Sequence, residues 1–514
     1  MSQDKILLSD QINYINVSVE SDVMYVLTGS VFFSNKEFNR NILFVVKFDN
    51  LILSKEECLL SGLCYSKNYG AYLYICEDIK NLFSISFLTP KNIKSMRIGF
   101  KKWYNQEDVS VSRELLLVNK YEKKVINLDQ LSYTEKHNTD YLVLTTRYPK
   151  DDDYYRNHFI HARVREYVNQ NNSVNVFGLA SDKSHLEYYQ FENIYVSMGS
   201  SQDLDRLISF NNYKNILIHF FNERMWNIVK KHIDNIKVTV WIHGYEVQPW
   251  YRRIFNYETE ESLEKAKSDS IKRMNFWKKL FHNLHPNLHF IFVSQYFANE
   301  VMEDLGIKLN QKTYSIIHNY INTNIFTYET KDPEQRKKIL SIRPYASRKY
   351  ANDLSVEAVL YIAEKYPDIF SKLEFRFIGD GILFDETLKP IEVFSNVKIE
   401  KRFLEQSEIA TLHKDYGLFL VPTRMDSQGV SKDEAMASGL VPITTNIAAI
   451  PEFVDKTCAI LAEPEDYKGL AEGIIQLYKD EQLFLEMSYN ASQRVRKQTN
   501  YQQTIAKELK LIKT

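Results

Sequence analysis

The sequence predicts an α/β protein in which an all-β N-terminal domain precedes two Rossmann-like domains that face a cleft. Three observations lead to this class. The 514 residues exceed what one hydrophobic core usually organises. The first part of the chain contains short alternating apolar runs, whereas the remainder alternates continuous apolar runs with amphipathic stretches. Alternating runs are typical of strands with one solvated face, and continuous runs are typical of parallel strands covered on both faces.

The all-β domain is predicted for residues 1–136. Its apolar runs are rich in aromatic and β-branched residues, which favour strands, and their number favours a sandwich. Residues 119–140 carry charge and no strong apolar period, so we expect a polar connection there. No recognisable chemistry lies in this domain. The strand candidates are Val23–Leu27, Ile42–Val46, Tyr72–Ile75, Leu82–Phe87 and Leu115–Val118.

The two α/β domains are predicted for residues 137–331 and 332–514, with the last helix, after Tyr501, crossing back. In open sheets of this kind, ligands bind beyond the carboxyl ends of the strands. Strands of the first domain are expected at Tyr141–Leu144, Val174–Phe177, Asn215–Ile218, Val238–Ile242, Phe290–Val293 and Tyr314–Ile317. Those of the second are expected at Ile339–Ile342, Phe375–Ile378, Val397–Ile399, Leu418–Val421 and Val441–Thr444, with helices at Leu354–Tyr366, Ser407–Lys414 and Lys468–Lys479.

Composition excludes several classes of protein. The 65 Lys and Arg residues nearly cancel the 66 Asp and Glu residues, so net charge gives no case for nucleic-acid binding. No run approaches the roughly 18 apolar residues of a membrane span, and the start lacks a signal-peptide pattern. We therefore expect a cytoplasmic protein, with peripheral contact at the inner face of a membrane left open. The cysteines lack paired metal-ligand spacing, so neither a zinc site nor a disulfide framework is predicted.

The strongest chemical signal is the segment from Leu418 to Val454, which reads as a strand, a loop with Gly429, a short helix and a second strand. The turn before such a helix aims backbone N–H groups at one point, which suits a phosphate or a developing oxyanion. Carboxylates at the two ends of the loop, Asp426 and Glu434, suit the vicinal hydroxyls of ribose and hexose. Alternatively, Ser431 and Glu434 form a capping box, and Glu434 only caps its helix.

This segment resembles the donor-binding stretch of glycosyltransferase family 4, a retaining family with the two-Rossmann GT-B fold. There a Glu-x7-Glu pair brackets a glycine-containing loop before Glu-Ala-Met-Ala-x-Gly, and here the pair reads Asp426-x7-Glu434. The resemblance implies that Glu434 binds ribose and that Asp426 lies beside the donor sugar. Because Asp is one methylene shorter than Glu, the hydroxyls that it reaches are left open. The loop residues implied in donor binding are Ser427, Gln428, Gly429 and Val430.

A second match implies a cationic clamp for the diphosphate. The run from Ile339 to Tyr350 resembles the family's strand and loop with an Arg and a Lys, which indicates Arg343 and Lys349, with Arg348 as an alternate. Fixed cations stabilise a departing nucleoside diphosphate in a dry cleft without a metal. The alternative interpretation is a solvated basic turn.

Two further matches concern the nucleotide. Phe377-Ile-Gly-Asp-Gly resembles the next strand end, where Gly379 and Gly381 would allow close backbone approach. Arg402-Phe-Leu falls where the family places the nucleobase, which indicates Leu404, whereas we expect Phe403 to be core.

The first α/β domain offers His243, at the end of a predicted strand, where family members place a histidine over the donor sugar. A structural hydrogen-bonding role is the alternative. Where the family has Gly-Gly after the first strand, this chain has other residues, so Arg156 and Tyr155 are assigned to phosphate or the acceptor side. Cations interleaved with aromatic residues between Gln248 and Leu284 could face an anionic membrane, an anionic acceptor or solvent alone.

The resemblance implies a bacterial hexosyltransferase with an extra N-terminal β-rich domain. It would transfer a sugar from a UDP- or GDP-sugar to a hydroxyl of a surface glycan, lipid-linked or glycoprotein acceptor, by a front-face mechanism and without a metal or other cofactor. Two alternatives stay open. A nucleotide-sugar epimerase would need no acceptor, and a GT-B-shaped non-catalytic partner or chaperone would fit the Asp426 substitution and the missing Gly-Gly. The N-terminal domain could bind polymer, a partner or a second copy.

Overall fold

The structure is a computed structural model. It describes residues 5–9, 12–33, 42–49, 51–66, 68–75, 82–103, 109–128, 132–133, 139–150, 157–180, 187–192 and 194–513. The chain divides into two compact units, which we describe separately. The first unit comprises Met1–Lys150, Asn172–Lys214 and Ile228–His232, and the second comprises Asp151–Asn171, Asn215–Asn227 and Ile233–Thr514. The predicted domain boundaries at residues 136 and 331 stay predictions.

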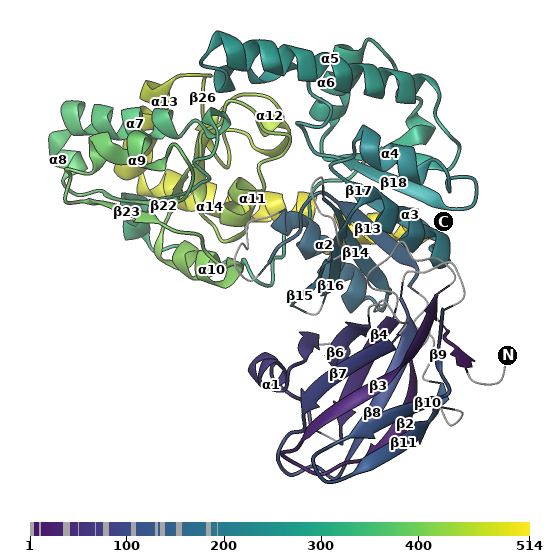
Figure 1. Ribbon diagram of the computed structural model, residues 1–514. Helices are drawn as coiled ribbons and strands as arrows, with labels where there is room; N and C mark the ends of the chain where they lie inside the picture. The colour runs from purple at the N-terminus through teal and green to yellow at the C-terminus, as the bar shows by residue number, and fades with distance from the viewer. Residues whose placement is uncertain are drawn as a thin grey trace. The chain divides into compact units, whose positions relative to one another are not determined.

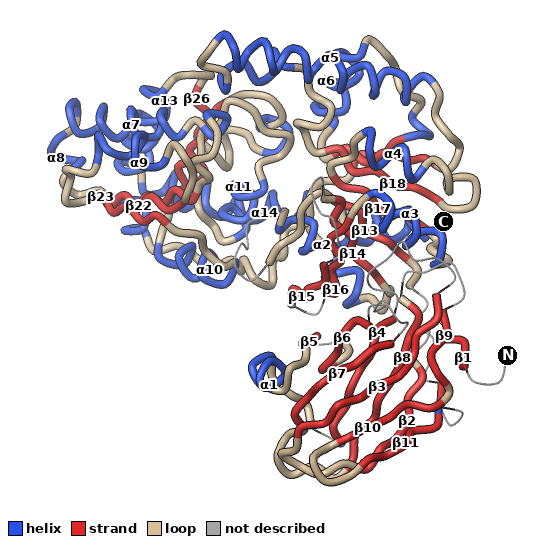
Figure 2. The backbone as a smooth tube through the Cα atoms, in the orientation of Figure 1, coloured by secondary structure: helices blue, strands red, loops and turns tan. Residues whose placement is uncertain are grey.

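The N-terminal part of the first unit is a β-sandwich, as predicted (Figure 2). A single hydrophobic cluster unites its sheets and includes Phe87 and Leu117 from the first sheet and Phe44 and Phe100 from the second. The first sheet contains β1 (Lys5–Leu7), β9 (Val109–Ser112), β3 (Met24–Phe33), β10 (Glu114–Val118) and β11 (Lys123–Asn127) in that order, with β7 (Leu82–Leu88) also on β3. The second contains β12 (Ser132–Tyr133), β2 (Asn13–Ser18), β8 (Ser95–Lys102), β4 (Ile42–Phe48), β6 (Gly70–Ile75) and β5 (Cys64–Ser66).

Two features of this sandwich differ from the sequence prediction. The expected connection at residues 119–140 contains β11 and β12, because Ile126 is buried and β10 supplies hydrogen-bond partners that the polar composition hides. A short helix, α1 (Lys55–Leu60), was not expected. It begins with a capping box in which the side chains of Ser54 and Glu57 each accept a bond from the other residue's backbone N–H.

Strands of the first predicted α/β domain occur in both units. In the first unit, β13 (Tyr141–Thr145), β14 (Val174–Leu179) and β16 (Ile194–Gly199) are parallel, and β15 (Glu187–Phe191) runs antiparallel to β16. The helix α3 (Ser201–Phe210) follows β16 in the chain. In the second unit, β17 (Asn215–His219), β18 (Lys237–Ile242), β19 (Leu288–Phe292) and β20 (Tyr314–Ile316) are parallel in that order. The helices between them are α2 (His158–Asn169), α4 (Glu223–Val229), α5 (Glu260–His282) and α6 (Gln295–Leu305), with the 3-10 helices η2 (Trp250–Asn256) and η3 (Gln311–Thr313).

The second sheet of the second unit contains six parallel strands. They are β23 (Val397–Lys401), β22 (Glu374–Gly379), β21 (Lys338–Ile342), β24 (Leu418–Leu420), β25 (Val441–Thr445) and β26 (Ile460–Ala462) in spatial order. Numbered along the chain this is 3-2-1-4-5-6, the order of a Rossmann sheet. The order of the strands changes direction between β21 and β24, although all the strands are parallel. Sheets of this kind bind ligands at the carboxyl ends of the two strands concerned, which we call the switch point.

Helices cover this sheet (Figure 1). Apolar residues of α7 (Asn352–Lys365) and α13 (Tyr467–Lys479) form one core cluster with the strands, including Leu354, Phe375 and Ile474. The other helices are α8 (Pro367–Phe370), α9 (Phe384–Leu388), α10 (Gln406–Asp415), α11 (Val430–Ala437), α12 (Ile450–Phe453), α14 (Glu481–Thr499) and α15 (Ile505–Lys513). The 3-10 helices are η4 (Pro333–Lys337), η5 (Arg348–Tyr350), η6 (Lys389–Ile391) and η7 (Tyr501–Gln503). No helix among the described residues is long and apolar enough to cross a membrane.

Candidate functional site

Arg343 stands at the switch point, directly after β21. Its side chain is buried, and Nη1 donates to Ser431 Oγ at 3.0 Å while Nη2 donates to the carbonyl oxygen of Pro422 at 3.4 Å. Its Nε is buried without a hydrogen-bond partner in the described part of the chain. Burial lowers the pKa of Arg343, and the nearby Asp426 carboxylate opposes that shift. A buried cation with an unused donor favours an anionic ligand.

The side chains of Lys349 and Arg343 both contact the ring of Tyr350. Arg343 Cζ is 4.9 Å and Lys349 Nζ is 5.0 Å from the centroid of Tyr350. Lys349 forms no ion pair with any described residue, whereas Arg348 pairs with Glu258. The structure therefore places Arg343 and Lys349 together and directs the alternate, Arg348, to a carboxylate of its own.

The loop after β24 ends in a helix whose first N–H groups are open. Gly429 is the N-cap of α11 and has a φ of 89°, a left-handed conformation that favours glycine. The N–H groups of Gly429 and Val430 have no acceptor among the residues that the structure describes. Free N–H groups at a helix start attract phosphate oxygens.

Asp426 and Glu434 both retain carboxylate oxygens for a ligand. Asp426 Oδ1 accepts a bond from the Gln428 N–H at 3.3 Å, and Glu434 Oε1 accepts one from Gln406 Nε2 at 3.2 Å. The capping-box alternative is wrong, because α11 has no side-chain cap and the Ser431 hydroxyl accepts from Arg343 instead. Burial raises the pKa of Glu434 to about 8, with a smaller contribution from Asp433, although Gln406 opposes the shift.

His243 is not isolated. Its Nε2 lies 2.9 Å from His219 Nδ1, and the two rings stack with centroids 5.2 Å apart. Burial lowers the pKa of His243 well below its ordinary value, and Arg163 lowers it further. Ser427 Oγ donates to the carbonyl oxygen of His243 at 2.9 Å. The loop between β24 and α11, called the donor loop below after its expected role, therefore contacts the end of β18 directly. His243 is therefore neutral and adjoins the loop, as a hydrogen-bonding group rather than an acid.

Gln428 has a structural role that the sequence did not reveal. Its Oε1 accepts from the Asn319 N–H at 2.6 Å, and its Nε2 donates to the Asn319 carbonyl at 3.3 Å and to Asp433 Oδ2 at 2.9 Å. Asp433 in turn pairs with Lys432, and both are fully buried. The side chain of Gln428 thus fixes the loop and is not directed at a ligand.

A buried ion pair extends this network. Arg163 of α2 donates from Nε to Glu508 Oε1 at 2.8 Å and from Nη2 to Asn319 Oδ1 at 2.8 Å. Glu508 of α15 also accepts from Trp241 Nε1 at 3.0 Å and from the Tyr167 hydroxyl at 2.5 Å. A charged hydrogen-bond network therefore connects α15, α2 and the end of β18 with the donor loop.

The predicted nucleotide contacts have mixed outcomes. A Cβ on Gly379 would lie 1.9 Å from the Arg343 carbonyl oxygen, and one on Gly381 would lie 2.3 Å from the Tyr345 carbonyl carbon. Both glycines therefore permit close approach to the main chain after β21. Leu404 is buried, whereas Phe403 is 44% exposed, so the expectation that Phe403 is core is wrong. Tyr155 and Arg156 lie outside the described residues.

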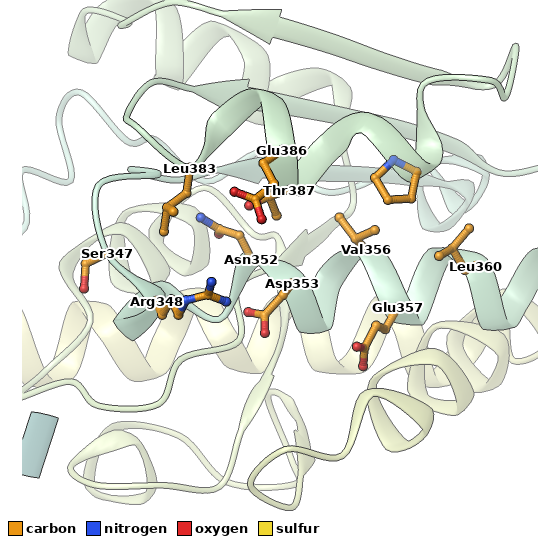
Figure 3. A pocket seen from close by; sticks show the side chains of 11 residues that line it. Ser347, Arg348, Asn352, Asp353, Val356, Glu357, Leu360, Leu383, Glu386 and Thr387 are labelled. Carbon is orange, nitrogen blue, oxygen red and sulfur yellow. The ribbon is translucent and has the colours of Figure 1, made fainter. Parts of the chain in front are cut away.

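A pocket of about 310 Å³ is lined by residues of η5, α7 and α9 (Figure 3). Arg348 and Asn352 line it together with three carboxylates, those of Asp353, Glu357 and Glu386. Arg343, Lys349, Asp426 and Glu434 do not line it. Because carboxylates repel phosphates, the charge of this pocket does not suit a diphosphate, and the switch point is the better candidate.

These features define a class of protein before any relative is considered: a Rossmann sheet with cations and free N–H groups at its switch point. Solved structures agree on the fold. The sucrose-phosphate synthase of Thermosynechococcus elongatus matches with a TM-score of 0.57 at 13% identity, covering 73% of this chain and 98% of that chain. A glycosyltransferase of Rickettsia africae matches with a TM-score of 0.52 at 12% identity, covering 73% and 98%. The predicted GT-B fold is confirmed.

Residues 343–480 match the family of glycosyl transferases group 1, so the chain contains a domain of that family. The N-acetyl-alpha-D-glucosaminyl L-malate synthase of Bacillus anthracis is 30% identical over 216 residues, which are 40% of this chain and 54% of that protein. One subunit of the human phosphatidylinositol N-acetylglucosaminyltransferase is 26% identical over 191 residues, 36% of this chain and 37% of that protein. The chain thus spans about half or less of these relatives' length. The predicted family relationship is confirmed for residues 343–480.

Proposed function

We propose that this chain is a retaining glycosyltransferase that moves a sugar from a nucleotide sugar to an acceptor hydroxyl. The observation that carries the proposal is the switch point itself. There the buried Arg343, the unpaired Lys349 and the free N–H groups of Gly429 and Val430 gather at the carboxyl ends of β21 and β24. Three kinds of positive group at one point suit a diphosphate.

The remaining residues have roles that follow from their positions. Glu434 would accept hydrogen bonds from the ribose hydroxyls with the oxygen that Gln406 does not use. Asp426 would contact the donor sugar, and the neutral His243 would position that sugar by a hydrogen bond. Supporting the donor class, an Escherichia coli protein with the same fold was solved with UDP-2-fluoro glucose bound, with a TM-score of 0.51.

In the proposed reaction, the bond between the sugar C1 and the diphosphate oxygen breaks as the acceptor oxygen bonds to C1 from the same face. The departing phosphate oxygen takes the acceptor's proton, so the products are the glycoside and the nucleoside diphosphate. Arg343 and Lys349 stabilise the charge on the leaving group. Because these side chains supply the positive charge, we propose that no metal or other cofactor is needed.

The test is a panel of UDP- and GDP-sugars monitored for nucleotide release, with and without bacterial surface glycans, lipid-linked sugars and glycoproteins as acceptors. Wild type and Glu434→Ala are compared, and each reaction is repeated with a chelator. We expect one donor to be turned over by wild type, unchanged by the chelator and strongly reduced in Glu434→Ala. Binding without turnover would support a non-catalytic partner instead. Conversion of the donor to an isomer without acceptor would support an epimerase.

A further inference from the structure

A cluster of arginines and tyrosines follows His243 in the second unit, and the reaction proposed above assigns it no role. Tyr245 is 54% exposed, and two guanidinium groups lie over its ring. Cζ of Arg253, from η2, is 5.3 Å from the ring centroid, and Cζ of Arg273, from α5, is 4.6 Å from it. A tyrosine ring supports a guanidinium but leaves its N–H donors available.

Arg253 is the unusual member of the cluster. It makes no hydrogen bond and no ion pair with any residue in the described part of the chain. Burial lowers the pKa of Arg253 and the neighbouring Arg273 lowers it further, whereas three tyrosines oppose the shift, namely Tyr257, Tyr350 and Tyr245. Arg273 differs, because its Nε and Nη2 both donate to the carbonyl oxygen of Gln248, at 3.2 and 2.7 Å.

Neighbouring charges do not neutralise Arg253. Glu246 interacts with it electrostatically, but the Glu246 oxygens already accept the N–H groups of His243 at 2.5 Å and Gly244 at 3.0 Å. The adjacent Arg252 instead donates to Asp304 at 2.8 Å. Of these two successive arginines, Arg252 is paired with a carboxylate, whereas Arg253 has donors available for a ligand.

The cluster lies beside the proposed diphosphate clamp. Ser347 Oγ donates to Asn256 Oδ1 at 2.7 Å, so η2 is bonded to the loop that carries Lys349. Tyr350, which both clamp cations approach, also interacts with Arg253. Arg253 therefore lies near the clamp residues. It belongs to η2, which follows His243, whereas the clamp residues follow β21.

We propose that Arg253 and Arg273 bind an anionic group, a phosphate or a carboxylate, carried by the acceptor. Besides burial, the charge of Arg273 lowers the pKa of Arg253, so the two guanidinium groups repel each other, and an anion bound to both offsets that repulsion. Their fork-shaped donors match the oxygens of phosphate and carboxylate. The donor's diphosphate already has Arg343 and Lys349, so the additional pair serves the other substrate. This inference rests on the proposed function and restricts its acceptor to anionic compounds.

Glycerol 3-phosphate and glycerol serve as matched probes, one with and one without the anion. Each probe is titrated into a reaction that contains the donor identified by the panel. Nucleotide release is followed, and the half-effective concentration of the probe is measured. UDP binding is measured separately by calorimetry, because it reports the donor side alone. The variants are Arg253→Gln, Arg253→Lys and, as a control of equal charge change, Lys272→Gln, whose exposed side chain precedes Arg273.

In wild type and in Lys272→Gln, we expect the half-effective concentration of glycerol 3-phosphate to be at least tenfold lower than that of glycerol. Loss of a charged hydrogen bond should raise its half-effective concentration about tenfold or more in Arg253→Gln, with partial recovery in Arg253→Lys and an unchanged Kd for UDP. Equal effects of the two probes, or no effect of either, overturn the inference. So does a matching loss of UDP affinity in Arg253→Gln, which would assign Arg253 to the donor. Absence of any nucleotide-sugar turnover in wild type instead overturns the proposed function.

Discussion

Two groups of charged residues in the second unit differ in one respect. Those under the donor loop all have partners: Glu508 pairs with Arg163, Arg163 bonds to Asn319, and Gln428 connects Asn319 with Asp433. The cations around Tyr350 and Tyr245 form no ion pair with a carboxylate among the described residues. Arg343 keeps an unpartnered Nε, and Lys349 and Arg253 pair with no carboxylate among the described residues.

We interpret this difference as one between charged residues that stabilise the fold and charged residues that bind a ligand. A buried charge without a partner costs several kcal/mol, so a folded chain keeps one only where a ligand or water compensates. The partnered network holds the loop in place, and we propose that the unpaired cations bind an anion. Variants of the first group should therefore change stability, and variants of the second should change binding.

The largest effect is expected on breaking the buried ion pair. Arg163→Met leaves Glu508 charged and buried, which should lower the free energy of unfolding by about 3–5 kcal/mol. The midpoint of urea unfolding measures it. The double variant Arg163→Met/Glu508→Leu should lose less than the sum of the two single variants, because it leaves no isolated charge. Additive losses would show that the pair is not coupled.

Removal of the buried clamp cation should reduce turnover instead. Arg343→Gln is expected to lower kcat/KM for nucleotide release about 10²- to 10³-fold, since a preorganised charge at the leaving group is lost. Arg376→Gln is the matched control, because this arginine of the next strand is paired with Glu400. It should change the urea midpoint but not kcat/KM. Equal losses of kcat/KM in the two variants would contradict the distinction between paired and unpaired cations.

Glu434 should make nucleoside binding depend on pH. Its pKa is raised from 4.5 to about 8, so at pH 7 roughly one carboxyl in ten is ionised. If the carboxylate accepts the ribose hydroxyls, affinity for uridine or guanosine should rise about tenfold between pH 6 and 7, a range in which the bases of these probes stay neutral. These probes carry no phosphate, so phosphate titration does not contribute. Glu434→Gln should show no such rise.

The raised pKa of Glu434 should also make the free energy of unfolding fall as pH rises, whereas nucleoside affinity should increase. The unfolded chain releases the Glu434 proton near pH 4.5, but the folded chain releases it only near pH 8. Between these values the folded state binds more protons, so the free energy of unfolding falls as pH rises. Glu434→Gln should remove that part of the fall, and a profile identical to that of wild type would show that the carboxyl is not buried in solution.

Local patterns predicted much of the fold and the switch point. Continuous apolar runs indicated β21, β22, β24 and β25, because alternate residues of these strands are buried in two core clusters. The Asp426-x7-Glu434 segment indicated the donor loop, since its glycine and small residues are next to one another in sequence. The exposed position of Phe403 was missed, because an aromatic residue after a strand reads equally well as core or surface.

The partnered network was not predicted, because it depends on residues far apart in the chain. Arg163 and Glu508 are 345 residues apart. Each did carry a local signal: Arg163 shares a helix face with Ile160 and Tyr167, and Glu508 shares one with Ile505 and Ile512. A charge on an apolar face requires a buried partner, but helical spacing does not identify that partner.

The smallest effect is expected for Arg348, and it decides which cation of η5 serves the clamp. Arg348 pairs with Glu258 at an exposed position, and such pairs contribute about 0–1 kcal/mol. Arg348→Gln should therefore lower the free energy of unfolding by less than about 1 kcal/mol and change the Kd for UDP less than about fivefold. Lys349→Gln, one residue away, should weaken UDP binding about tenfold, because it removes a cation that has no carboxylate of its own. A larger loss for Arg348→Gln than for Lys349→Gln would assign the diphosphate to Arg348, whose pairing with Glu258 would then have to open when the nucleotide binds.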